Sequence, residues 1–329
     1  MNAVYISNFG GPENLGIRDV PDLVEPPSGT QVLVRVKAAG LNRADLIQRR
    51  GNYPPPHGYS PNIPGLEFAG EVAGVGDAVT AFHIGERVFG IVAGEAQAEF
   101  VLTDERVLAK IPDNLSFTEA AAVPEVFITA HDAIFTLAEL KQGETILIHA
   151  VGSGVGLAGL QLAKAAGATV VGTSRTEDKL EKCREFGLDE AIVTGRPLEF
   201  SGIVKERTDG KGVDVILDLV GATYFQQNLE SLALKGRLVL VGLTAGSTAE
   251  FNMSIALYKR LRIIGTALRA RPIEEKAEAT HRFARDVVPL LADGTLRPNL
   301  DRVFSVEDVR EAHEYLESND SFGKVVLEF

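Results

Sequence analysis

Apolar and polar positions follow two different patterns along the chain. Up to about residue 120, short runs rich in β-branched residues alternate with turn clusters of Gly, Pro and polar residues, which is typical of an antiparallel β-domain. We expect one helix in this region, at 42–49, because three prolines follow it at 54–56 and cannot continue a helix. The expected strands lie at 4–6, 31–38, 67–75, 87–92 and 96–101.

From about residue 125 to 265 the pattern alternates between apolar runs and helical periodicity. The apolar runs are continuous and rich in Val, Ile and Leu, which is typical of a parallel sheet buried on both faces. Strands are expected at 145–150, 168–173, 191–193, 213–219, 237–242 and 261–266, and helices at 154–166, 177–186, 199–207 and 223–232. The last of these strands is expected at one edge of the sheet. The flanking elements are helices at 118–122, 127–137, 273–291 and 306–317 and a strand at 324–329.

These patterns predict an α/β protein with two domains. Residues 125–267 form a doubly wound parallel-sheet (Rossmann) domain that binds a dinucleotide. Residues 1–124 and 268–329 form a β-rich domain, which the second segment rejoins after the nucleotide-binding domain. A length of 329 residues agrees with two domains.

Residues 145–175 carry the clearest motif, a strand, a glycine-rich turn, a helix and a second strand. Small residues at the turn let the backbone approach a pyrophosphate, and the first amides of the helix point at its charge. Two registers remain open: GVGLAG at 154–159 fits the glycine fingerprint but begins late, whereas the other places Val151, Ser153 and Gly156 at its three positions. The glycines could also serve helix packing alone. The residues expected to face the pyrophosphate are Gly152, Ser153, Gly154, Val155 and Gly156.

The end of the second strand indicates which dinucleotide fits. An NAD site usually carries an acidic residue there, but this sequence has Thr173, Ser174 and Arg175, with Lys179 one turn later. Hydroxyl groups and cations suit the 2′-phosphate of NADPH. We therefore predict NADPH as the cofactor, with Ser174, Arg175 and Lys179 as contacts. The alternative is that both cations are solvated surface charges.

Composition excludes several classes of function. Lys plus Arg total 33 against 45 for Asp plus Glu, a net charge of −12 that disfavours nucleic-acid binding. One cysteine, Cys183, permits neither a disulfide framework nor an all-cysteine zinc site. We expect no signal peptide and no membrane-spanning segment, and therefore a cytoplasmic protein.

Several stretches together resemble the medium-chain dehydrogenase/reductase superfamily. Within it, the chain is similar to the zinc-independent, NADPH-dependent quinone oxidoreductases, and most similar to the subgroup that contains the p53-inducible quinone oxidoreductase. The resemblance implies a GroES-like catalytic domain beside the Rossmann domain. The stretches that carry it are LNRADLIQRRGNYPPP (41–56), PGLEFAGEV (64–72), GERVFGI (85–91), AAAVPEVFITA (120–130), HAVGSGVGLAGLQLAKAAGA (149–168) and GKVVLEF (323–329).

The resemblance also implies an active site without metal. Zinc-dependent relatives carry Cys, His and Cys where this sequence has Asn42, Leu66 and Glu125. Asn42 is then expected near the nicotinamide, although it could equally cap the helix at 43–49. Asp45 is expected to be structural. Tyr53 matches a residue that lies over the quinone, and its alternative is a surface tyrosine packed on prolines.

Further cofactor contacts are implied by position in the family. Thr129 resembles a residue that contacts the nicotinamide ribose, and Thr194 stands where the subgroup has a larger residue at the adenosine. Lys324 resembles a residue that reaches the cofactor, and could alternatively be a solvated lysine. The remaining expected contacts lie at the carboxyl ends of two strands: Gly242, Leu243, Thr266, Ala267 and Leu268.

These observations predict an NADPH-dependent quinone oxidoreductase. Alignment of cofactor and substrate would be the main task of the protein, since reduction of a quinone needs little acid–base help. One alternative is reduction of the C=C bond of an enal or enone, and another is a non-catalytic NADPH-binding protein. The predicted partners are a small quinone or conjugated carbonyl and a second copy of the chain, because the apolar edge strand at 261–265 invites pairing across a two-fold axis.

Overall fold

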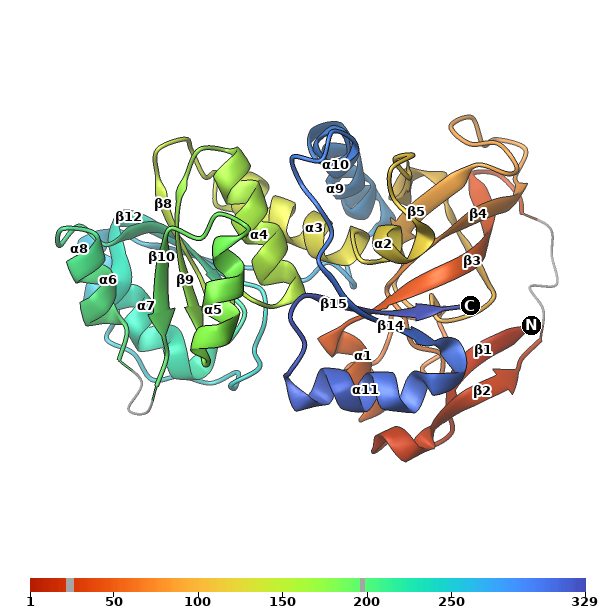
Figure 1. The fold of residues 1–329 in the computed structure, drawn as a ribbon, viewed down its shortest axis with the longest axis horizontal. Coiled ribbons are helices and arrows are strands. Elements are labelled where there is room, and N and C mark those ends of the chain that lie inside the picture. The colour runs from red at the N-terminus through yellow and green to blue at the C-terminus, as the bar shows by residue number, and fades with distance from the viewer. Residues whose placement is uncertain (22–26, 196–198) are drawn as a thin grey trace. The chain divides into compact units, whose positions relative to one another are not determined.

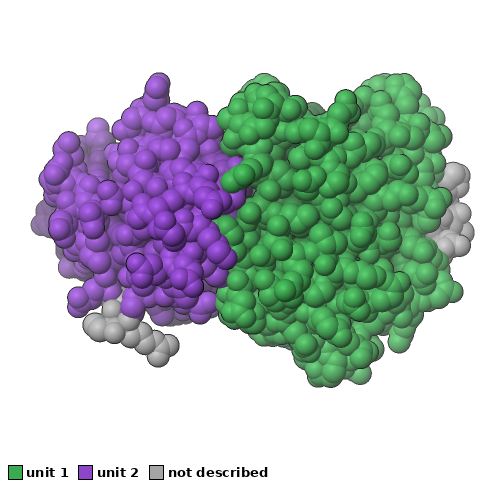
Figure 2. Space-filling view, in the orientation of Figure 1, with its two compact units in different colours: residues 1–128, 268–329 green, residues 129–267 purple. Residues whose placement is uncertain are grey.

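The computed structural model describes residues 1–21, 27–195 and 199–329. They divide into two compact units, which Figure 2 shows in different colours. Unit 1 comprises residues 1–128 and 268–329, and unit 2 comprises residues 129–267. The α/β fold class that the sequence predicted is confirmed, because unit 2 contains a parallel sheet and unit 1 is rich in antiparallel strands.

The main sheet of unit 1 is built around its longest strand, β3 (Gln31–Leu41), which pairs with β15 (Lys324–Glu328), β4 (Glu67–Val75) and β6 (Phe100–Asp104). Val32, Val34 and Val36 of β3 point into the core. The remaining strands are β14 (Leu300–Ser305), parallel to β15, and β5 (Arg87–Ile91) and β7 (Leu108–Lys110), in the order β14-β15-β3-β4-β5-β7. Strands β1 (Asn2–Ile6) and β2 (Leu15–Asp19) form a separate antiparallel pair.

Several expected elements of unit 1 need correction. The strand expected at 96–101 begins only at Phe100. Within the expected range, Ala98 pairs with Ala3 in an isolated bridge rather than in a continuous strand. The helix expected at 273–291 is two helices, since Pro289 lacks the amide that a continuous helix would need. The helices of unit 1 are α1 (Arg43–Arg49), α2 (Phe117–Ala121), α9 (Ile273–Asp286), α10 (Val288–Ala292) and α11 (Val309–Ser318), with 3₁₀ turns at Pro12–Asn14, Glu105–Val107 and Val306–Asp308.

The chain passes from unit 1 into unit 2 along α3 (Pro124–His131). Proline is favourable at the start of a helix, where its missing amide would have no partner. The segment Asp132–Leu137 then continues as a π-helix, so the single helix expected at 127–137 begins earlier and changes its winding. Among the described residues, no helix is both long and apolar enough to cross a membrane.

Within the described residues, the sheet of unit 2 has six parallel strands in the order β10-β9-β8-β11-β12-β13. The chain moves outward from β8 first on one side and then on the other, so the strand order reverses between β8 and β11, where such folds bind ligands. Helices lie on the sheet in Figure 1. The strands are β8 (Thr145–Ile148), β9 (Thr169–Ser174), β10 (Glu190–Val193), β11 (Val213–Asp218), β12 (Leu232–Leu240) and β13 (Arg262–Gly265).

The helices of unit 2 follow the expected alternation with one addition. The helix α8 was not predicted, because it is short and most of its apolar side chains remain exposed. The helices are α4 (Gly154–Ala165), α5 (Glu177–Arg184), α6 (Ser201–Arg207), α7 (Phe225–Ser231) and α8 (Met253–Lys259), with a 3₁₀ turn at Ala222–Tyr224.

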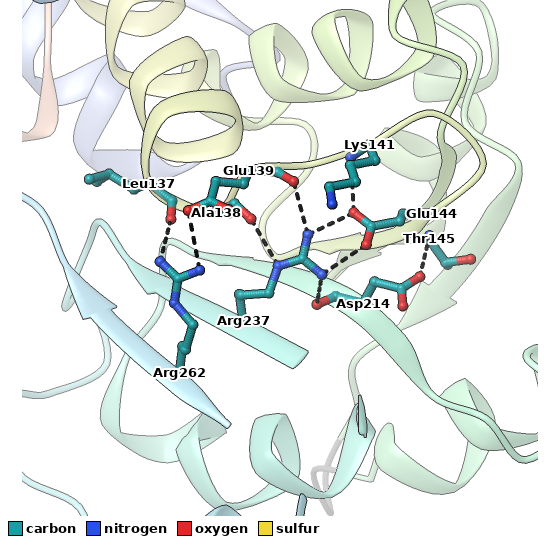
Figure 3. Close-up of polar contacts among 9 residues, drawn as sticks. All are labelled: Leu137, Ala138, Glu139, Lys141, Glu144, Thr145, Asp214, Arg237 and Arg262. Carbon is teal, nitrogen blue, oxygen red and sulfur yellow. Dashed lines mark hydrogen bonds and ion pairs between the residues drawn. The ribbon is translucent and has the colours of Figure 1, made fainter. Parts of the chain in front are cut away.

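A charged cluster holds the amino end of this sheet together (Figure 3). The five N–H groups of Arg237 on β12 donate to the carbonyls of Ala138, Glu139 and Asp214 and to both carboxylate oxygens of Glu144, over 2.7–3.2 Å. Burial raises the pKa of Glu144, but the hydrogen bonds from Arg237 and Lys141 outweigh it and hold that pKa below its ordinary value. We call Arg237 with these partners the Arg237 cluster.

Candidate functional site

The turn between β8 and α4 presents unsatisfied amides. Ser153 is the N-cap residue of α4, and its hydroxyl accepts from the amide of Gly156 at 3.2 Å. A Cβ at Gly156 would lie 2.5 Å from the carbonyl oxygen of Ala150, so only glycine fits there. Gly154 is the first residue of the helix, which places the fingerprint GVGLAG inside α4 rather than in the turn.

This helix start fits a pyrophosphate. Within the described part of the chain, the amides of Gly154 and Val155 have no hydrogen-bond acceptor, as is usual in a first helical turn. Such amides bind anions, and the helix dipole adds to the attraction. Gly152 is buried in the turn, whereas Ser153, Gly154 and Val155 are partly exposed.

The carboxyl end of β9 carries the residues expected at the ribose phosphate. Ser174 is buried at the strand end, and the next residue, Arg175, is exposed with no ion-pair partner among the described residues. Lys179 lies half-buried on α5. Thr194 is buried, donates its hydroxyl to the carbonyl of Ser174 and accepts from Tyr224 at 2.9 Å, so it stabilises this strand end.

The carboxyl ends of β8 and β11 are joined by buried polar side chains. His149 makes hydrogen bonds with Thr173 at 2.9 Å and Asn228 at 2.6 Å, and Asn228 donates to Asp218 at 2.9 Å. Burial lowers the pKa of His149, which favours the neutral ring. Asp218 also accepts from the amides of Val220 and Gly221. This network fixes the loops that follow the strands.

The other expected contacts lie at the ends of the remaining strands or at the points where the chain passes from one unit to the other. Gly242 follows β12 and is held against Leu219, since a Cβ there would lie 2.7 Å from the Leu219 oxygen. Leu243 beside it is 53% exposed. The amide of Thr266 donates to the carbonyl of Leu240 at 3.0 Å. Thr129 and Ala267 are the first and last residues of unit 2, and Leu268 is a buried residue of unit 1.

In unit 1, Asn42 and Lys324 meet at a buried carboxylate. The amide of the Asn42 side chain donates to Glu67 at 2.8 Å, and the Lys324 ammonium donates to Glu67 at 2.6 Å. Lys324 also donates to the side-chain oxygen of Asn42 and to the carbonyl of Leu41. Lys324 is 4% exposed and Glu67 is fully buried, so the solvated-lysine alternative is wrong.

Two further acids lie beside this ion pair. Asp45 accepts from the backbone amides of Asn42 at 2.8 Å and Gly65 at 3.1 Å, which supports its expected structural role. Burial raises the pKa of Asp45 to about 6. Glu125 is the second residue of α3, and its backbone amide donates to the Glu67 carboxylate at 2.8 Å. We call Asp45, Glu67, Glu125 and Lys324 the carboxylate cluster.

Tyr53 stands over a buried arginine of the same unit. The guanidinium of Arg269 lies 4.8 Å from the centre of the Tyr53 ring and donates to the Tyr53 carbonyl at 2.9 Å. Arg269 also donates to Ala93 at 2.7 Å and to Gln48. Tyr53 is therefore held by more than contact with prolines. Its burial raises the pKa of its hydroxyl.

Known protein families match segments of both units. Residues 28–132 match the family described as "Alcohol dehydrogenase GroES-like domain", and residues 154–285 match "Zinc-binding dehydrogenase". The chain is 32% identical to human quinone oxidoreductase over 99% of its own length and 97% of that protein. It resembles the Escherichia coli quinone oxidoreductase complexed with NADPH (29% identity, TM-score 0.89, all of both chains) and the CurK enoyl reductase (27%, 0.87, 99% and 98%).

The chain belongs to the quinone oxidoreductase family of medium-chain dehydrogenases/reductases. It is therefore an oxidoreductase that uses a nicotinamide cofactor and acts on a small molecule. The helix start and strand ends of unit 2 have the donors that such a cofactor needs, whereas placement of individual contacts stays a proposal.

The donor groups of this medium-chain reductase do not fit a catalytic zinc ion. Of the three positions at which zinc-dependent relatives carry ligands, Leu66 is a buried apolar residue and Asn42 has both its amide nitrogen and oxygen in hydrogen bonds. Only Glu125 offers a ligand atom, and zinc needs three from the protein. No group of three or more His, Cys, Asp and Glu suited to a metal occurs among the described residues.

Sequence reasoning missed Glu67 and Arg269. Glu67 directly precedes the apolar run Phe68–Gly70 at the start of β4, which is a signal for a buried charge with a partner. The partner lies 257 positions away in the sequence, and no local pattern points to it. Arg269 follows the last strand of unit 2 and carries no local signal at all.

Proposed function

We propose that this protein is an NADPH-dependent quinone reductase that works without a metal ion. The observation that carries the proposal is the binding of Asn42 to Glu67 and Lys324 of the carboxylate cluster, because Asn42 stands where zinc-dependent relatives carry a zinc ligand. Bound NADPH would supply the hydride, and the protein would supply alignment and hydrogen-bond donors. The full-length likeness to quinone oxidoreductases supports the substrate class.

Residues of both units would divide these tasks. Gly154 and Val155 would hold the pyrophosphate through their backbone amides, and Gly152, Ser153 and Gly156 would shape the turn around it. Ser174, Arg175 and Lys179 would bind the 2′-phosphate. In unit 2, the proposed contacts of the nicotinamide half are Thr129, Gly242, Leu243, Thr266 and Ala267, and Thr194 would support the adenosine end. In unit 1, the proposed cofactor contacts are Asn42, Leu268 and Lys324. Tyr53 would stack on the quinone, its ring held by Arg269.

Stopped-flow oxidation of NADPH by 1,4-benzoquinone tests the reaction. Turnover is expected with metal-free protein, and dialysis against a chelator should leave the rate unchanged. Absence of turnover with any quinone, at full occupancy by NADPH, would overturn the proposal.

Replacing Arg175 by alanine tests the cofactor. We expect binding of NADPH to weaken by about 10- to 100-fold, which corresponds to loss of one charged hydrogen-bond partner, while binding of NADH changes little. Arg207→Ala is a matched control, because Arg207 is an exposed arginine that pairs with Glu190 on β10. Equal weakening of both nucleotides by Arg175→Ala would contradict the role in 2′-phosphate binding.

A second candidate function is reduction of the C=C bond of an enal or enone. The likeness to the CurK enoyl reductase favours it, since that protein matches nearly the whole chain. Rates with 1,4-benzoquinone and 2-alkenals, measured side by side, decide between the two. Tight binding of NADPH with negligible turnover on either would instead support a non-catalytic nucleotide-binding protein.

We also propose that the protein is a cytoplasmic homodimer. Strand β13 is an edge strand of the sheet in unit 2, and α8, which precedes it in the chain, exposes Met253, Leu257 and Tyr258 by 70–78%. An apolar edge of this kind favours pairing with a second copy. Light scattering at micromolar concentration should give the dimer mass, and Leu257→Lys should give the monomer. A wild-type monomer would contradict the proposal.

A further inference from the structure

The side-chain carboxyl of Glu125 has no hydrogen-bond partner among the described residues, unlike the other acids of the carboxylate cluster. The three N–H donors of Lys324 are all in use, on Leu41, Asn42 and Glu67. Both oxygens of Asp45 accept backbone amides. The cluster therefore has one carboxyl group more than its hydrogen-bond donors can satisfy.

The surroundings of Glu125 favour its neutral form. Its neighbours include Glu67 on β4 and Asp45 on α1, which repel a negative charge, and Lys324 on β15, Arg269 and Lys276 on α9, which attract one. Burial is the largest effect, and with Glu67 it raises the pKa of Glu125 to about 8. At neutral pH the residue is a carboxylic acid with a proton to donate.

The position of Glu125 connects this proton to the expected substrate. The charge of Glu125 acts on the hydroxyl of Tyr53, the residue proposed to stack on the quinone. Tyr53 is held over Arg269, and its hydroxyl has no hydrogen-bond partner in the described part of the chain. Two proton-bearing groups, the Glu125 carboxyl and the Tyr53 hydroxyl, thus belong to one region of unit 1, and neither has a hydrogen-bond partner among the described residues.

We propose that Glu125 is the general acid of the reaction and donates its proton to the oxygen of the reduced quinone. The inference rests on the proposed quinone reductase function. Reduction by NADPH adds two electrons and one proton to the quinone and leaves the hydroquinone monoanion. The O–H bond of Glu125 then breaks, an O–H bond forms on the negative oxygen, and the Glu125 carboxylate regains a proton from water. A donor with a pKa near the working pH suits this role.

Infrared spectroscopy of the nucleotide-free protein tests the proton itself. At pH 7, where Asp45 with its pKa of about 6 is mostly ionised, wild-type protein should still show the carbonyl band of a buried carboxylic acid, and this band should disappear with a midpoint near pH 8. Glu125→Gln has nearly the same shape but no acidic proton, and should lack the band. Glu328→Gln changes an exposed acid of the same unit and should retain it. A Glu125 that is already ionised at pH 7 overturns the inference.

Turnover tests the step. With 1,4-benzoquinone, wild-type kcat should be constant below pH 8 and fall above it, whereas Glu125→Gln should be about 100-fold slower with no such fall. Binding of NADPH should be equal in both proteins. An active wild type with an unchanged Glu125→Gln rate and pH profile overturns this inference alone. A wild type that binds NADPH but reduces no quinone overturns the proposed function, and the proton donation with it.

Discussion

Each unit of this protein contains a charged cluster, and the two clusters differ in how their hydrogen-bond donors match their acceptors. In the Arg237 cluster of unit 2, the five donors of one guanidinium meet five acceptors, and the single carboxylate involved has its pKa held low (Figure 3). In the carboxylate cluster of unit 1, three acids share one lysine. The first arrangement holds strands together, whereas in the second burial and the nearby Glu67 raise the pKa of Glu125 to about 8.

The comparison shows how to separate a structural cluster from a chemical one. Complete pairing fixes every group in a single charge state, so the cluster contributes rigidity and nothing that changes with the reaction. A surplus acid in a buried site has two charge states of similar free energy near neutral pH. The following changes test that difference, in order of decreasing effect.

Lys324→Met should have the largest effect on stability. It leaves the fully buried Glu67 without its cation, and breaking a buried pair in this way costs about 4 kcal/mol. Urea unfolding measures the loss. Adding Glu67→Gln should restore more than half of it, because the uncompensated charge is gone. A double variant no more stable than Lys324→Met would show that packing of the lysine, rather than its charge, is what matters.

Arg237→Met should destabilise unit 2 by about 3 kcal/mol, since it leaves the carbonyls of Ala138, Glu139 and Asp214 and the Glu144 carboxylate without their donor. The loss should be smaller than for Lys324→Met because Glu144 retains contact with solvent. Thermal unfolding followed by circular dichroism is the measurement. Binding of NADPH by the folded variant should be unchanged, as the cluster lies at the amino end of the sheet.

Glu125→Gln should change how stability depends on pH. The pKa of Glu125 is raised from 4.5 to about 8, so between these pH values the folded state binds a proton that the unfolded state lacks, and the free energy of unfolding falls as pH rises. The variant removes this fall. The free energy of unfolding of the variant should exceed that of wild type by about 2 kcal/mol at pH 9 and equal it near pH 5. This difference is smaller than the whole pKa shift would give, because Glu125 is partly exposed to solvent. A constant difference across this range would place the ionisation elsewhere.

Arg262→Gln should have the smallest effect. Its ion pair with Glu139 spans 3.3 Å, and both side chains are more than half exposed, so the expected change is within about 0.5 kcal/mol. The same urea titration used for Lys324→Met gives the value. A loss comparable to that of Arg237→Met would mean that exposure is a poor guide to the strength of these pairs.

The sequence predicted the elements of unit 2 well, because their signals are local. Apolar runs, helical periodicity and the small residues around Gly156 depend only on neighbours in the chain. The same local reasoning failed for α8, on which Met253, Leu257 and Tyr258 stay exposed, and for the π-helix Asp132–Leu137, which has no distinct composition.

The candidate site was predicted less completely, because its chemistry arises from distant residues. Asn42 was expected near the cofactor or as a helix cap, and it is the N-cap residue of α1 with its side chain bound to Glu67 and Lys324. Glu125 was noted only as a missing zinc ligand. Its unusual protonation depends on Glu67, Asp45 and Lys324, which come together only in the folded sheet.

The position of β15 has a consequence for how the protein is made. This strand lies between β14 and β3 in the sheet of unit 1, yet it follows unit 2 in the chain. On the ribosome, the nucleotide-binding unit emerges and can fold before β15 has been made. At that stage β3 lacks β15 as a neighbour, and Glu67 lacks Lys324. A chain that stalls before residue 324 would therefore carry an open sheet edge and a buried acid without a cation, and both mark it for proteolysis rather than for use.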